Sequence, residues 1–129
     1  MAEPKPIAKD SHLWRRVPDI HWFEVEPGVR RASSAAFQDD PDGSPVSTPL
    51  KEESTLAQVF DPVRSHTMAF ALAKLPACVA FDKEQQLIRA PTADEPAHVL
   101  LIGNKTKSLR NAFVRGSTWA WPPPWRPYP

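Results

Sequence analysis

Four consecutive apolar residues at positions 99–102 give the clearest strand signal in the chain. The run is short and is bounded by a proline and by Gly103, which fits a strand buried on both faces better than an amphipathic helix. Asn104 then offers a side chain that can cap a helix. Apolar positions at helical spacing follow, and they predict a helix over 105–115 that ends at a left-handed Gly116.

A longer apolar stretch predicts the main helix over residues 62–75. Asp61 can cap its first turn, Pro62 suits the first helical position, and Pro76 ends the helix. Residues 68–73 are apolar nearly all round. This helix is therefore expected to be central and buried.

Short runs with alternating or β-branched residues predict the strands. In residues 13–17, Leu13, Arg15 and Val17 would share one face of a strand. Further strands are expected at 21–25, 46–48, 79–81 and 86–88, while 30–37 fits either a strand or a helical turn. Together these elements predict one small α+β domain with two main helices and a mixed or antiparallel sheet of roughly four to six strands.

The domain is expected to occupy residues 12–118. Residues 1–11 contain prolines and lysines and are typical of a flexible segment. Residues 119–129 form a tail rich in tryptophan and proline, which cannot be helical and is expected to adopt polyproline II locally. The tail can contact a partner or fold back on its own domain. The candidate contact residues are Trp119, Trp121, Trp125 and Tyr128.

The net charge is +1 over 129 residues, so the whole chain lacks the strong charge typical of proteins that bind polyanions. The distribution is uneven, because the last acidic residue is Glu95. Basic residues alone follow it: Lys105, Lys107, Arg110, Arg115 and Arg126. Internal complementarity between the two parts of the chain is the simpler interpretation, and a nucleic-acid surface over 103–126 is the alternative.

The single cysteine, Cys78, leaves no intrachain disulfide framework and suits a reducing compartment. The start of the chain has no apolar targeting segment, and no run approaches the ~18 apolar residues of a membrane span. A cytoplasmic protein that does not enter the membrane is therefore expected. No metal and no cofactor are expected, because the histidines show no metal-ligand spacing. They are His12, His21, His66 and His98.

A glycine-containing turn that leads into a helix can bind an anion, because the first turn of a helix has free N–H groups. The candidate anion-binding residues are Gly103, Asn104, Lys105 and Lys107. The spacings of phosphate-binding loops are absent. A strand, turn and helix with solvated lysines is the simpler interpretation of the same residues.

Four short blocks resemble sequence found in a group of short bacterial hypothetical proteins. The blocks are residues 13–16, 33–37, 42–47 and 96–100. This resemblance implies a bacterial protein and no particular mechanism. A weaker resemblance is to RES-type and other ADP-ribosyltransferase-like domains, which begin with a strand carrying an arginine and continue to a strand carrying a serine or tyrosine. Arg15 and Ser47 would take those places, which implies transferase chemistry.

Polar residues from different segments form a candidate enzyme site. They are Arg15, Ser34, Ser47 and His98. His98 stands next to a buried strand and could act as a base for Ser34 or Ser47. An enzyme requires at least two of the set to lie within about 5 Å of each other. A hydrogen-bonded structural histidine is the simpler interpretation.

Three functions fit the sequence. We favour a non-catalytic binding or accessory protein of a bacterial system, such as a toxin or defence operon, that acts through contacts with a protein partner. The second is a small ADP-ribosyltransferase-like or other transferase or hydrolase, and the third is a nucleic-acid binder. No pattern in the sequence indicates the identity of the partner or the oligomeric state.

Overall fold

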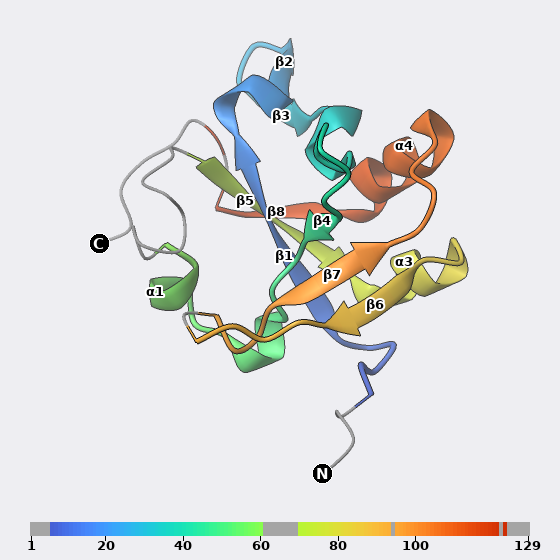
Figure 1. Cartoon of the computed structure of the whole chain (residues 1–129). Helices are drawn as coiled ribbons and strands as arrows, with labels where there is room; N and C mark the ends of the chain where they lie inside the picture. Colours follow the sequence, from blue (N-terminus) through green and yellow to red (C-terminus); the bar gives the residue numbers. More distant parts are fainter. Residues whose placement is uncertain (1–5, 61–69, 94, 122, 124–129) are drawn as a thin grey trace, which may run out of the picture.

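The computed structural model describes residues 6–60, 70–93, 95–121 and 123. In these residues the chain forms eight strands, arranged in three antiparallel sheets, and three α-helices (Figure 1). The predicted α+β class is confirmed. The strands divide among three small sheets instead of forming the expected single sheet.

The first sheet has the order β1-β5-β8 and joins distant parts of the chain. Its strands are β1 (His12–Pro18), β5 (Phe70–Pro76) and β8 (Thr118–Trp121). β1 confirms the strand predicted at 13–17, and it pairs with β5 along its whole length. β5 lies in the middle of the sheet and is almost entirely buried.

The prediction of a helix over 62–75 is wrong for residues 70–75, which belong to β5. Residues 61–69, which include His66, lie outside the described residues. A central strand covered on both faces is apolar at successive positions, and periodicity cannot distinguish this pattern from that of a buried helix.

The second sheet has the order β4-β7-β6. β7 (Val99–Ile102) lies between β4 (Val46–Ser47) and β6 (Gln86–Arg89), which confirms a central strand at this position. Val99 and Leu101 are fully buried, whereas the residues between and after them are only partly buried. The strand is therefore fully covered on one face rather than on the expected two.

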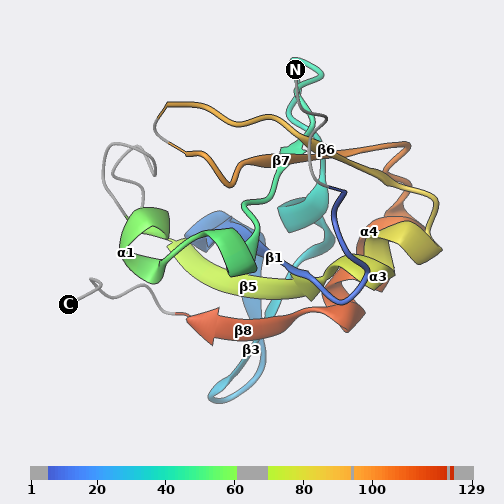
Figure 2. The ribbon, with the colours of Figure 1, turned by 90° about the horizontal axis from the view of Figure 1, so that it is seen from below.

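The main apolar core lies between these two sheets (Figure 2). Leu13 and Leu75 enter it from the first sheet, and Leu101 enters it from the second. A smaller apolar cluster, which includes Trp14 and Leu72, lies on the other face of the first sheet. Leu13 and Trp14 enter different clusters because successive residues of a strand point to opposite faces of the sheet.

The α-helices are short and lie at the ends of strands. They are α1 (Leu56–Val59), α3 (Ala77–Asp82) and α4 (Lys107–Gly116). The strand predicted at 79–81 is wrong, because these residues form the middle of α3. Its buried residues, Ala77 and Ala80, are three positions apart, which is the spacing of residues on one face of a helix. No helix among the described residues is long and apolar enough to cross a membrane.

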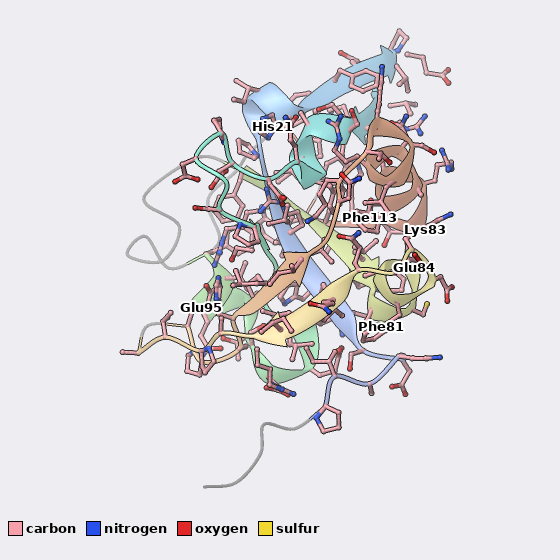
Figure 3. All side chains as sticks on the ribbon, turned by 45° about the vertical axis from the view of Figure 1, so that its right-hand side comes forward. His21, Phe81, Lys83, Glu84, Glu95 and Phe113 are labelled. Carbon is pink, nitrogen blue, oxygen red and sulfur yellow. The ribbon has the colours of Figure 1, made fainter. Side chains whose placement is uncertain are left out.

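α4 confirms the helix predicted at 105–115, with a later start. Thr106 caps it in place of Asn104, and its hydroxyl accepts from the backbone N–H of Leu109 at 3.2 Å. Phe113, which is labelled in Figure 3, fixes the helix to the core. It packs edge-on against Phe37, with ring centroids 5.6 Å apart.

Gly116 does not adopt the expected left-handed conformation. A Cβ at this position would lie 3.0 Å from a methyl group of Val79 on α3. The glycine therefore lets the two helices approach each other closely.

The third sheet is a projecting hairpin of β2 (Trp22–Glu26) and β3 (Val29–Ala32), seen at the top of Figure 1. Gly28 in its turn has φ +80°. A 3₁₀ turn at Ser34–Phe37 follows and packs on α4. The segment 30–37 fitted either a strand or a helical turn. Its first part belongs to the strand β3, and its last part forms the 3₁₀ turn.

Candidate functional site

Ser47 and His98 form the shortest contact among the predicted site residues. Ser47 Oγ lies 2.6 Å from His98 Nε2. The two meet because Ser47 of β4 pairs with Leu100 of β7, and His98 stands two residues before that partner on the same strand face. The distance meets the requirement for two polar groups to act together.

The other nitrogen of the His98 ring fixes its tautomer. Nδ1 lies 2.9 Å from the backbone carbonyl oxygen of Ala90. A carbonyl oxygen can only accept a hydrogen bond, so Nδ1 carries the hydrogen and, in the neutral ring, Nε2 has a free lone pair. Ser47 is then the donor in its contact with His98.

Arg15 joins the same cluster from β1. Its Nη1 donates to the backbone oxygen of Ser47 at 3.2 Å, and its Nε donates to the backbone oxygen of Ala36 at 2.6 Å. Burial lowers the pKa of Arg15 to about 10, against an opposing effect of Asp40. At neutral pH the side chain is still charged, so a guanidinium is held next to the main chain of Ser47.

His21 lies at the base of the hairpin, near the end of β1 (Figure 3). Its Nδ1 is buried and has no hydrogen-bond partner. Burial, followed by the charge of Arg15, lowers the pKa of His21 below its ordinary value. This histidine is therefore held in its neutral form more firmly than it is in an unfolded chain.

The fourth member of the predicted set, Ser34, does not join this cluster. It lines a separate open groove of about 460 Å³ between the hairpin and α4. We call this the basic groove, and it is lined by Phe23, Arg31, Ala32, Ser33, Ser34, Lys107, Asn111, Val114 and Arg115.

The basic groove carries cations and no opposing acid. Arg31, Lys107 and Arg115 line it, and none of its described lining residues has a carboxylate. A smaller pocket of about 210 Å³ continues it toward β8, sharing Arg31 and adding Arg30 and Trp119. The groove can therefore hold an anionic group and a flat or apolar group together.

The basic groove was not predicted from the sequence, because Arg31 lies far along the chain from Lys107. The signal on α4 was present: Lys107, Asn111 and Arg115 recur every four residues and so share one helix face. The position of the hairpin beside that face depends on tertiary packing, above all on the contact between Phe37 and Phe113.

The structure divides the predicted anion-binding set. Lys105 Nζ lies 3.0 Å from Asp39 Oδ1 and 3.0 Å from the backbone oxygen of Gly103, and the Lys105 side chain is 4% exposed. The backbone oxygen of Asn104 accepts from the side chain of Gln85. Of the four residues only Lys107 reaches the basic groove.

The predicted nucleic-acid surface over 103–126 is also divided. Four of its basic residues lie in the described part of the chain: Lys105, Lys107, Arg110 and Arg115. Lys105 is held in its internal ion pair, and Arg110 donates to Gln38 Oε1 at 3.2 Å. Lys107 and Arg115 line the basic groove.

The hairpin exposes an apolar face beside the groove. Phe23, Val25 and Val29 are 47%, 46% and 48% exposed. Phe23 pairs with Arg31 across the hairpin, so this apolar face, which we call the hairpin face, continues into the basic groove.

The first part of the predicted tail folds on the domain. Trp119 and Trp121 belong to β8, where Trp119 Nε1 donates to the backbone oxygen of Arg30 at 3.0 Å. The ring of Trp121 lies 5.3 Å from that of Phe60. These residues form a strand rather than the expected polyproline II. Trp125 and Tyr128 lie outside the described residues.

Within the residues that the structure describes, no three His, Cys, Asp or Glu side chains gather where they could hold a metal ion. No family model, curated protein or solved structure matches the chain.

Proposed function

We propose that this chain is a binding protein whose partner is a protein segment that carries carboxylates next to apolar side chains. The observation that carries the proposal is the basic groove, with cations and no carboxylate, beside the exposed hairpin face. We place the protein in the cytoplasm of a bacterium, in a system where it acts through this contact.

The hairpin face supports an apolar half of the interface. Single exposed apolar side chains are common on protein surfaces, whereas several that share one face mark an interaction site. Phe23 and Val29 lie on one face of a projecting two-stranded sheet, because Phe23 pairs with Arg31 and Val29 stands two residues before Arg31. Val25 is exposed as well, at the irregularity of the pairing between Glu24 and Glu26. A partner that covers this face would remove apolar area from water, which favours association.

The basic groove supports a charged half of the interface. Lys107 and Arg115 are exposed on α4, and Arg31 is exposed on β3. Their charge is local, since the net charge of the chain is only +1. Such a patch attracts acidic segments and sets their orientation, more than it adds to the final affinity.

The test is a fluorescence titration with a labelled peptide of alternating glutamate and phenylalanine. Lys107→Glu combined with Arg115→Glu is expected to weaken binding at low salt by about tenfold or more, equivalent to ~1.4 kcal/mol, and to flatten its salt dependence. The matched control is Lys9→Glu combined with Lys83→Glu, which changes the net charge equally at exposed positions outside the groove. This control is expected to bind nearly as well as the wild type.

The apolar half is tested separately. Phe23→Ser combined with Val25→Ser is expected to lower affinity for the peptide at every salt concentration, because these side chains act by contact rather than by charge. Equal affinity of all variants would contradict the proposal. Tighter binding of a labelled oligothymidine than of the peptide would instead favour a nucleic-acid partner in the same groove, with Phe23 as the stacking surface.

A further inference from the structure

We propose that Ser47, activated by His98, is a reactive nucleophile that accepts an acyl group from activated esters. This activity is separate from the binding function, because Ser47 lies on β4, His98 directly precedes β7, and neither lines the basic groove. The proposal rests on the 2.6 Å contact between Ser47 Oγ and His98 Nε2, together with the hydrogen bonds that hold both residues.

His98 is anchored on both its main chain and its ring. The backbone N–H of Ala90 donates to the backbone oxygen of His98 at 2.9 Å, and the ring Nδ1 lies 2.9 Å from the backbone oxygen of Ala90. The backbone N–H of His98 donates to Glu95. The ring can therefore neither turn freely nor change tautomer without losing a hydrogen bond, and its Nε2 lone pair stays directed at Ser47.

Ser47 is held from a different direction of the fold. Arg15 donates to its backbone oxygen, and the guanidinium is itself fixed on Ala36. The guanidinium therefore fixes the main chain of Ser47 and brings a positive charge next to this residue. The nucleophile and the cation lie on β4 and β1, and the base directly precedes β7.

The neighbouring hydroxyl shows how a purely structural contact differs. Thr48 is fully buried, and its Oγ1 donates to the backbone oxygen of Val99 at 3.3 Å. Ser47 and His98 are only partly buried, so a small reagent can reach them. The hydroxyl of Ser47 is also paired with a base rather than with a carbonyl oxygen.

Ser47, His98 and water supply every group that the reaction needs. Ser47 Oγ attacks the acyl carbon and passes its proton to His98 Nε2, the ester C–O bond breaks, and the leaving alkoxide or phenolate takes the proton from His98. Water then attacks the acyl-serine with His98 again as base. This second step releases a carboxylic acid and restores Ser47.

The test is to treat the full chain with an alkyl fluorophosphonate, which phosphonylates an activated serine with loss of fluoride. Intact-mass measurement is expected to show one adduct, and peptide mapping is expected to place it on Ser47. Ser47→Ala should abolish labelling, and His98→Gln should slow it by about 100-fold, the usual contribution of a general base. Ser44→Ala, which removes a nearby exposed serine without a histidine partner, should label at the wild-type rate.

Circular dichroism of each variant shows whether it is folded. If His98→Gln does not fold, the site of the wild-type adduct decides the question alone. The absence of an adduct on Ser47, or equal labelling of a folded His98→Gln variant, would overturn the proposal. The labelling experiment contains no peptide partner, so a negative result would not affect the proposed binding function. A negative peptide titration would likewise not affect the proposed reactivity of Ser47.

Discussion

The surroundings of His21 oppose a positive charge on its ring. Its Nδ1 is buried without a partner, and burial and then Arg15 lower its pKa below 6.5. The folded state therefore holds the proton more weakly than the unfolded chain does. Stability that depends on this residue is present above about pH 6.5 and is lost as the pH falls below it.

We expect His21→Gln to reduce this pH dependence. Between pH 7.5 and pH 5.5 the free energy of unfolding of the wild type should fall more steeply than that of the variant. Only the wild type has a histidine here, and its unfolded state binds a proton more readily than its folded state does. Urea unfolding at several pH values measures the difference. Parallel curves for the two proteins would show that His21 does not contribute.

At the scale of elements, the sequence signals were reliable where a pattern had clear ends. The strand 99–102 and the helix after it were predicted because breakers bound the first and helical spacing marks the second. β5 was misread because both its faces are covered, so Phe70–Pro76 is apolar at every position except Lys74, as a buried helix can also be. α3 was misread because three apolar residues are too few to show a period.

The candidate sites, too, were predictable in residue type but not in their contacts. Arg15, Ser47 and His98 could be chosen by residue type, but their contacts depend on the pairing of β4 with β7 and on the position of β1. The basic groove could not be predicted, because it joins β3 to α4 across two thirds of the chain. Pairing at such separation is set by the whole core, which no local pattern describes.

β8 supplies the element-scale prediction. A chain that ends at Ser117 loses the pairing of β8 with β5, the hydrogen bond of Trp119 and the ring contact of Trp121. We expect this truncation to lower the free energy of unfolding by about 3 kcal/mol, because it removes two partly buried tryptophans together with the pairing, and one fully buried aromatic residue alone costs that much. A chain that ends at Pro123 is the control, because it keeps β8 and the hydrogen bond from Arg30 Nη1 to the backbone oxygen of Pro123 at 3.4 Å. It should be more stable than the shorter chain. Equal stability of both truncations would contradict the assigned role of β8.

At the scale of the whole molecule, β1 joins two apolar cores. Leu13 lies in the main core and Trp14 in the smaller one, on opposite faces of the same strand. The main chain of β1 also contacts the segment that follows β4 of the second sheet, because the N–H of Trp14 donates to the backbone oxygen of Pro49 at 2.8 Å. Neither core can open without disturbing this strand.

We therefore expect the two cores to unfold together. Leu13→Ala should cost about 2–5 kcal/mol and Trp14→Ala about 3–5 kcal/mol, because each leaves a cavity in a closed core. In both variants, urea transitions followed by circular dichroism and by tryptophan fluorescence should coincide. Separate transitions in the Trp14→Ala variant would show that the smaller core is an independent unit.

The order β1-β5-β8 has a consequence for synthesis on the ribosome. β1 and β5 leave the exit tunnel before β8, so one side of β5 has peptide donors and acceptors without partners while the remaining residues are translated. An unpaired, strongly apolar edge of this kind is a template for intermolecular association. Until Thr118–Trp121 leaves the tunnel and pairs with β5, that edge is open to association with a neighbouring chain, which dilution or a chaperone would oppose.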